Sequence, residues 1–219
     1  MRHSKHALPE ARNHAAFRHM LKLNSFVLLL VSAPLARADI GAIEIHRLIE
    51  SARSQIGVTR GYDPTYRMLS YPNGDVPLDT GVCTDVITRA LRAQKIDLQK
   101  LVHEDMSGNF SRYPKRWGLK RPDSNIDHRR VPNLMTFFAR EKVELSVSSH
   151  ALDYAPGDIV AWNLGGGVTH IGIVSDQRTL FRRPLVIHNI GGGAQEENIL
   201  FRYKIIGHYR LNAQHKLPR

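Results

Sequence analysis

Cysteine is nearly absent from this sequence, because Cys83 is the only one among 219 residues. A single thiol excludes an internal disulfide. Proteins that meet an oxidising compartment usually pair their cysteines, so an unpaired one there needs a reason. Either Cys83 is buried and inert, as free cysteine often is, or it is kept for chemistry. The residues around Cys83 are needed to decide between these two interpretations.

Long hydrophobic runs are missing as well. The apolar run Phe26–Ala36 is too short to span a bilayer. It follows a basic segment and ends in small residues, a pattern typical of a cleaved secretory signal over residues 1–38. A buried N-terminal helix is the alternative. We expect translation to start at Met1 or Met20, and the mature chain to start at Asp39, without a membrane span, in the periplasm or outside the cell.

Acidic residues are fewer than basic ones, 20 against 31, which gives a net charge of +11 at pH 7. Six of the basic residues and one acidic residue lie within residues 1–38, so +6 remains on the rest. This charge favours anionic partners, of which nucleic acid, acidic lipid and a carboxylate-rich cell wall are examples. Export argues against nucleic acid. We therefore expect peptidoglycan or another anionic peptide as the partner.

Motifs for metals and nucleotides are also lacking. The chain contains no His-Glu-x-x-His, and "VHED" at 102–105 has no partner at a metal-ligand spacing. The two glycine triplets lack the Lys-Ser/Thr of a phosphate-binding loop. We expect no metal and no cofactor.

The segment around Cys83 predicts a helix. In "VCTDVITRALRAQ" (82–94), apolar residues recur at i, i+4 and i+8, and Asp79 and Thr80 are good N-cap residues. Cys83 then falls in the first turn, where free backbone N–H groups and the helix dipole favour a thiolate. This position favours a reactive cysteine over an inert one.

Two histidines are candidates for the base that a thiol nucleophile needs. His170 opens "HIGIVSD", and His188 lies near the end of "PLVIHNIGGG"; both segments read as buried strands. A glycine triplet lies beside each of them, Gly165–Gly167 and Gly191–Gly193. Bare backbone next to a histidine leaves room for a substrate chain. The alternative is that both are hairpin turns next to satisfied core histidines.

At these residues the chain resembles two known groups of proteins. The motifs "YPNGDVPLDTGVCTDV", "LVHEDM", "YPKRWGL", "NIDHRRVPNL" and "HNIG" resemble those of a bacterial family known as domain of unknown function 1287. The order of the cysteine, "APGDIVAW", "THIGIVSD" and "VIHNIG" also resembles the NlpC-type branch of the papain-like cysteine peptidases, which are bacterial cell-wall hydrolases.

The second resemblance implies roles for particular residues. Cys83 matches the nucleophile, and His170 matches the general base that takes the thiol proton and later protonates the leaving amine. His188 matches the residue that orients His170, with Asn189 as the competitor because the two face opposite sides of a strand. Tyr62 matches a tyrosine beside the cleft.

A basic insertion is expected at about 103–132. Its part Arg112–Arg130 holds seven Lys and Arg against two acidic residues, with aromatics between them. A solvated loop is one interpretation. The other is a substrate-facing loop in which arginines bind the free carboxylates of a peptide. The candidate binding residues, besides Tyr62, are Arg116, Trp117, Arg129 and Arg130.

The remaining pattern predicts one catalytic domain over 39–219, an α+β fold and a monomer. An apolar stripe predicts a helix that begins at Ile45 and ends at Gly57, "NLMTFFAREKVEL" predicts another, and strands are expected near 158–162, 169–175, 185–190 and 205–210. Helices followed by antiparallel strands give helices packed on a small antiparallel sheet. The resemblance implies that this is a papain-like, NlpC-type arrangement.

The sequence therefore predicts an exported thiol hydrolase that cleaves an amide bond, with peptidoglycan stem peptides as the first candidate substrate. Two alternatives remain open. One is a non-catalytic module on the same fold that binds cell wall or a partner. The other is acyl transfer or thioester chemistry with the same Cys-His-polar triad.

Overall fold

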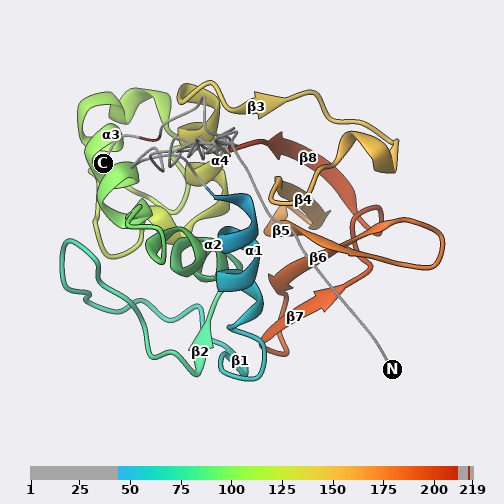
Figure 1. Ribbon diagram of the computed structural model, residues 1–219. Coiled ribbons are helices and arrows are strands. Elements are labelled where there is room, and N and C mark those ends of the chain that lie inside the picture. Colours follow the sequence, from blue (N-terminus) through green and yellow to red (C-terminus); the bar gives the residue numbers. More distant parts are fainter. Residues whose placement is uncertain (1–43, 212–216, 218–219) are drawn as a thin grey trace, which may run out of the picture. The chain divides into compact units, whose positions relative to one another are not determined.

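The computed structural model describes residues 44–211 and Leu217. The predicted signal at 1–38 lies outside the described residues. Among the described residues, four α-helices precede most of the sheet in the sequence (Figure 1): α1 (Ile45–Arg53), α2 (Cys83–Arg92), α3 (Leu98–Asn109) and α4 (Val131–Arg140). No helix among the described residues is long and apolar enough to cross a membrane.

The main sheet has six strands in the order β3-β8-β4-β5-β6-β7, and every neighbouring pair is antiparallel. The strands are β3 (Glu144–Leu145), β4 (Ile159–Gly165), β5 (Val168–Arg178), β6 (Pro184–Asn189), β7 (Ala194–Glu197) and β8 (Lys204–Tyr209). A helix layer on an antiparallel sheet is an α+β fold, so the predicted fold class is confirmed.

The hydrophobic core lies between the helices and the sheet, and a second cluster covers the other sheet face. Ile171 of β5 and Ile187 of β6 pack with Val86 of α2 in the first cluster. Trp162 and Val174 belong to the second cluster. Side chains alternate between faces along a strand, so β4, β5 and β6 are buried on both sides. This burial explains their near-continuous apolar sequence.

Three details differ from the prediction. Helix α3 occupies the first part of the segment expected to be a polar insertion, because Leu98, Val102 and Met106 form a buried stripe on an otherwise polar helix. The short strand β7 has the polar sequence AQEE, and β3 has only two residues, so neither carries a strand pattern. Loop residues 113–126 remain as the irregular part of the insertion.

Candidate active site

A cleft of about 490 Å³ opens beside the start of α2. Cys83 lies at its floor, and Tyr62 and Trp117 form part of its wall. The β4–β5 hairpin contributes residues 166–169, and the segment that begins α4 contributes residues 129–132. The cleft therefore contains the predicted nucleophile and three of the segments that the sequence singled out.

Cys83 is the first residue of α2, and its side chain is buried, with 3% of the residue exposed. The sequence suggested Asp79 or Thr80 as the N-cap, but neither residue caps the helix. The N-cap is Val82, and its backbone N–H donates to the Asp85 carboxylate over 2.7 Å. This contact is one half of a capping box, because the Val82 side chain has no acceptor for the other half, and it helps to fix the first turn and with it the thiol.

Asp85 is held from the other side by Arg129. The guanidinium donates twice to the carboxylate, from Nε over 3.1 Å and from Nη2 over 3.0 Å, and both side chains are almost fully buried. Arg129 also donates to the carbonyl oxygens of Asp63 and Thr65. It thus joins the loop after Tyr62 to the nucleophile helix. Four of its five N–H groups are bound within the protein, which gives Arg129 a structural role. It also lines the cleft, and its binding of substrate carboxylates stays a prediction.

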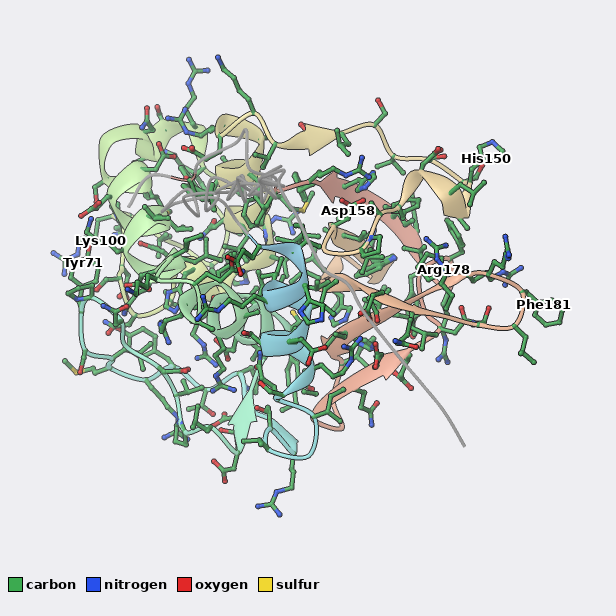
Figure 2. All side chains as sticks on the ribbon, in the orientation of Figure 1. Tyr71, Lys100, His150, Asp158, Arg178 and Phe181 are labelled. Atoms are coloured by element: carbon green, nitrogen blue, oxygen red, sulfur yellow. The ribbon has the colours of Figure 1, made fainter. Side chains whose placement is uncertain are left out.

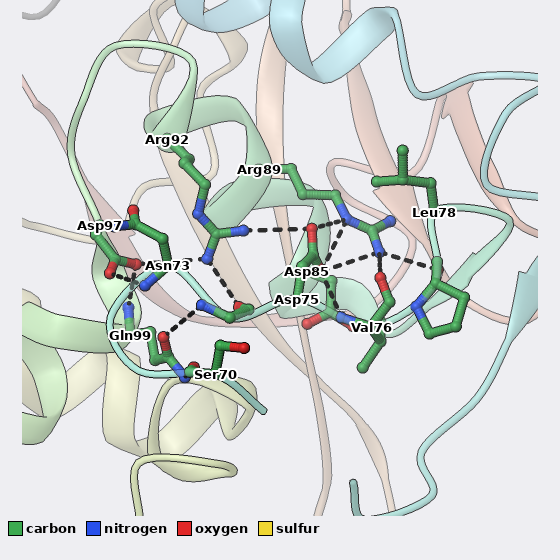
Figure 3. Close-up of polar contacts among 12 residues, drawn as sticks. Ser70, Asn73, Asp75, Val76, Leu78, Asp85, Arg89, Arg92, Asp97 and Gln99 are labelled. Atoms are coloured by element: carbon green, nitrogen blue, oxygen red, sulfur yellow. Dashed lines mark hydrogen bonds and ion pairs between the residues drawn. The ribbon is translucent and has the colours of Figure 1, made fainter. Parts of the chain in front are cut away.

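The loop of residues 63–79 is tied to α2 by a second arginine (Figure 3). Arg89 binds the Asp75 carboxylate, with Nε 3.0 Å from Oδ2, and donates to three backbone carbonyls within residues 76–80. Arg89 is nearly buried, with 8% of its side chain exposed. These contacts hold the chain that leads directly into Cys83.

Burial governs the protonation of Cys83. It raises the pKa of the thiol to about 12, although backbone N–H groups, first that of Ile171, act in the opposite direction. The prediction that the helix start makes this cysteine a thiolate is therefore wrong, because removing the sulfur from water outweighs the N–H groups. Cys83 is a neutral thiol at pH 7.

Tyr62 reaches the cleft through a short parallel pair of strands, β1 (Gly61–Tyr62) and β2 (Thr80–Gly81). Tyr62 lies opposite Gly81, two residues before Cys83. Burial, followed by the nearby Cys83 and Asp85, raises the pKa of Tyr62 to about 12. The phenol therefore keeps its proton at neutral pH and can donate it to the sulfur or to a substrate.

The two predicted histidines are in direct contact. Nε2 of His170 lies 3.0 Å from Nδ1 of His188, and Nε2 of His188 lies 3.1 Å from a carboxylate oxygen of Glu197. Both histidines are buried, whereas the Glu197 side chain is 42% exposed. The result is a His–His–Glu chain that runs from the interior to the surface.

Glu197 was missed by the sequence analysis. It lies on the short edge strand β7, opposite Val186 of the neighbouring strand β6. From there its side chain contacts His188, which belongs to β6 as well. The signal available was the acidic pair at 196–197 after the second glycine triplet. Nothing in the sequence indicated that this pair folds back as a strand beside His188.

His170 is neutral for the same reason as Cys83. Burial, followed by the charge of the nearby His188, lowers the pKa of His170 to about 3. The ring stacks on Trp162, its cross-strand neighbour. Because Nε2 is bound to His188, Nδ1 is the ring nitrogen left for a thiol proton. The imidazole is therefore neutral at pH 7 and can accept a proton at Nδ1, but a pKa of about 3 makes it a weak base.

Cys83 and His170 both lie near the start of β5, but their side chains have different surroundings. The sulfur interacts with the backbone N–H of Ile171, the residue after His170. Cys83 belongs to the core cluster on the helix side, and Trp162, on which His170 stacks, belongs to the other cluster. Within the described part of the chain, no hydrogen bond joins the thiol to either histidine. The pairing of Cys83 with His170 therefore stays a prediction.

Asn189 has a different place from His188. Its Nδ2 donates to the carbonyl oxygens of Gly61 and Gly81, at 3.0 and 3.1 Å, and its Oδ1 accepts from the N–H of Gly191. It joins the end of β6 to β1 and β2. Of the two candidates for the orienting residue, His188 is the one that contacts His170.

Arg130 is the arginine that faces the cleft without a carboxylate partner among the described residues. Its guanidinium carbon lies 4.2 Å from the ring centroid of Trp117, and its Nη1 is buried without a hydrogen-bond partner in the same part of the chain. Arg116 is exposed and does not line the cleft. Of the predicted arginines that line the cleft, only Arg130 has a guanidinium nitrogen without a hydrogen-bond partner among the described residues.

The part of the chain that the structure describes contains no group of side chains arranged to bind a metal ion. Groups of three or more His, Cys, Asp or Glu side chains close enough to hold an ion do not occur there. The His–His–Glu chain is joined by hydrogen bonds between its members, which use the nitrogen atoms that a metal would need.

Comparisons with known proteins agree with the family that the sequence motifs resemble. The profile of the family described as "Domain of unknown function (DUF1287)" matches residues 49–211. "Uncharacterized protein YijF" of Escherichia coli (strain K12) is 60% identical over 163 residues, which are 74% of this chain and 80% of that protein.

Two solved structures also match. NlpC1 from Trichomonas vaginalis has a TM-score of 0.41 at 13% identity, covering 80% of this chain and 48% of that one. A Staphylococcus aureus protein described as similar to lipoprotein, NLP/P60 family, has a TM-score of 0.37 at 13% identity, covering 75% and 41%. The chain thus spans about half the length, or less, of these two proteins.

Proposed function

The chain belongs to the family described as "Domain of unknown function (DUF1287)", and we propose that it is an exported thiol hydrolase that cleaves an amide bond. Cys83 is the proposed nucleophile, and peptidoglycan stem peptides are the proposed substrate. The observation that carries the proposal is the position of Cys83: a lone cysteine at a helix start, lining a cleft, beside strand β5, which carries the first histidine of the His–His–Glu chain.

The protonation states require a general base, because the thiol is not ionised in advance. The raised pKa of Cys83 and the lowered pKa of His170 oppose the transfer, so the attack on the amide must drive it. The Cys83 thiol and the His170 imidazole are both neutral at pH 7, so no thiolate–imidazolium pair exists before substrate binds. As the sulfur attacks the amide carbon, its proton moves to Nδ1 of His170. Nε2–H of the His170 imidazolium then donates to Nδ1 of His188, and Glu197, which contacts Nε2 of His188, supplies the compensating negative charge.

The following steps complete the reaction. The amide oxygen becomes negative in the tetrahedral intermediate, and the backbone N–H of Cys83 and the Tyr62 hydroxyl are the donors available to it. The C–N bond breaks, and His170 returns the proton to the leaving amine. Water, deprotonated by the same imidazole, then hydrolyses the thioester and releases the free thiol.

The substrate class is proposed from charge. Peptidoglycan stem peptides carry free carboxylates, which an arginine fork binds in bidentate geometry. Arg130 offers such a fork at the cleft, and Trp117 holds it in place by stacking. Neutralisation in Arg130→Gln should therefore raise KM for an acidic peptide and leave kcat nearly unchanged. Arg116→Gln, on an exposed residue outside the cleft, is the matched control.

One observation favours the non-catalytic alternative. Cys83 is buried and its thiol is protonated at pH 7, as that of an inert core cysteine would be. A binding module would retain affinity for cell wall in Cys83→Ala and would release no products. Acyl transfer differs in another way, because an added amine would compete with water for the thioester.

Digestion of purified peptidoglycan tests the proposal. Unaltered protein should release fragments with new amine and carboxyl ends, detected by mass spectrometry. Cys83→Ala should release none while melting at nearly the same temperature, and His170→Ala should be slower by roughly 10²–10⁴-fold. Equal product release by Cys83→Ala would refute the thiol mechanism.

A further inference from the structure

The hairpin between β5 and β6 projects beyond the sheet (Figure 1). At its end lie Leu180 and Phe181, which are 99% and 88% exposed. Figure 2 shows Phe181 at the outermost point of this hairpin, directed away from the rest of the fold. Two adjacent large apolar side chains at this exposure bury almost nothing within the described chain. They therefore add nothing to its core.

Positive charge surrounds these two side chains. Arg178, Arg182 and Arg183 flank them, and no acidic residue occurs between 177 and 184. None of the three arginines forms an ion pair within the described residues. We name residues 178–183 the hairpin tip. It contains two exposed apolar side chains flanked by three arginines that form no ion pair within the described residues.

The backbone holds the hairpin tip in one arrangement. The N–H of Thr179 donates to the carbonyl of Arg183 over 2.8 Å, and the N–H of Arg182 donates to that of Thr179 over 2.9 Å. Nη1 of Arg178 donates to the carbonyl of Arg182 over 3.0 Å. Leu180 and Phe181 are thus presented by a hydrogen-bonded turn. A pre-ordered turn loses little conformational freedom when it binds.

We propose that the hairpin tip is a membrane-surface anchor for anionic lipid. Leu180 and Phe181 would enter the boundary between headgroups and acyl chains, and the arginines would bind the headgroup phosphates. Apolar side chains combined with a basic rim are the chemistry that binds such interfaces. A lipid surface is favoured over an acidic pocket of a protein partner, because Leu180 and Phe181 are almost fully exposed at the end of the hairpin (Figure 2) and the arginines beside them form no ion pair within the described residues.

The hairpin tip and part of the cleft lie at opposite ends of β5, so an anchor at the tip affects where the cleft is held. The cleft is formed by residues 166–169 at one end of β5, and the hairpin tip follows the other end. A strand rises about 3.3 Å per residue, so roughly 30–40 Å separates the two ends. A molecule bound by its hairpin tip therefore holds the cleft well away from the lipid surface. This inference does not depend on the thiol chemistry proposed above.

A local probe at the hairpin tip tests the proposal. In the full chain, Phe181→Trp is compared with Leu152→Trp, because Leu152 is 84% exposed and is followed by an acidic residue, Asp153. Vesicles contain phosphatidylglycerol and phosphatidylcholine in equal amounts, or phosphatidylcholine alone. We expect a blue shift and quenching by doxyl-labelled lipid only for Phe181→Trp, and only with the anionic vesicles. Subtraction of the unaltered chain removes the signal of the two native tryptophans.

The charge requirement is tested in the same Phe181→Trp chain. Arg182→Gln with Arg183→Gln should weaken binding to the anionic vesicles by roughly 25-fold, at about fivefold for each arginine. Arg112→Gln with Lys115→Gln removes the same charge elsewhere on the surface and should change binding by less than about fivefold. No shift at position 181, or equal shifts at 181 and 152, would overturn the proposal. Self-association abolished by Leu180→Ser would overturn it too, in favour of a second copy as the occupant.

Discussion

Replacing Arg129 by methionine should destabilise the fold strongly. The Arg129–Asp85 pair is buried, with 2% and 4% of the side chains exposed, and it holds the carboxylate that accepts the N–H of Val82 at the start of α2. Loss of the guanidinium leaves the Asp85 carboxylate buried without compensation, which costs about 3–5 kcal/mol. For a domain of this size, 1 kcal/mol corresponds to about 2–4 °C in Tm, so the melting temperature should fall by roughly 6–20 °C.

The control and the rescue make the reasoning specific. Lys100→Met removes an i,i+4 ion pair with Glu104 whose side chains are 36% and 53% exposed, and such pairs contribute about 0.3–0.5 kcal/mol. Adding Asp85→Asn to Arg129→Met should restore part of the stability, because the amide is neutral and its oxygen still accepts the N–H of Val82. Chemical denaturation measures all four chains. A loss below about 1 kcal/mol for Arg129→Met would refute the structural role.

Three predictions concern the candidate site. Alkylation of Cys83 by iodoacetamide in the absence of substrate should be on the order of 10³-fold slower at pH 8 than for an ordinary cysteine, because its pKa is about 12 instead of 9.0; a titration midpoint below pH 9 would contradict this. His188→Gln should lower kcat more than Asn189→Asp lowers it, since only His188 contacts His170; the reverse order would assign the orienting role to Asn189. Glu197→Gln should lower kcat about tenfold with unchanged Tm, because it removes the charge opposite the imidazolium, whereas a purely structural Glu197 would change Tm instead.

The sequence predicts those parts of the fold that depend on local pattern. The alternation of β-branched residues after His170 and before His188 predicts two buried strands, and the structure contains both, as β5 and β6. The apolar spacing after Cys83 predicts α2 within one or two residues. These features follow from periods of 2 and 3.6 residues, which a single segment displays.

The parts that were missed depend on residues far apart in the chain. Asp85 and Arg129 are 44 residues apart, and no spacing rule joins them. Glu197 reaches His188 only because a polar segment returns as an edge strand. The raised pKa of Cys83 depends on how completely the folded chain removes its sulfur from water, while the helix start alone suggests the opposite shift.

Trapping of an acyl-enzyme tests the central claim most directly. The protein is mixed with peptidoglycan-derived stem peptides, quenched with acid within milliseconds to seconds, digested and analysed by mass spectrometry. We predict a thioester adduct on the peptide that contains Cys83, released by hydroxylamine and absent from His170→Ala quenched at the same times. Product formation without an adduct on Cys83, or an adduct on another residue, would contradict the account.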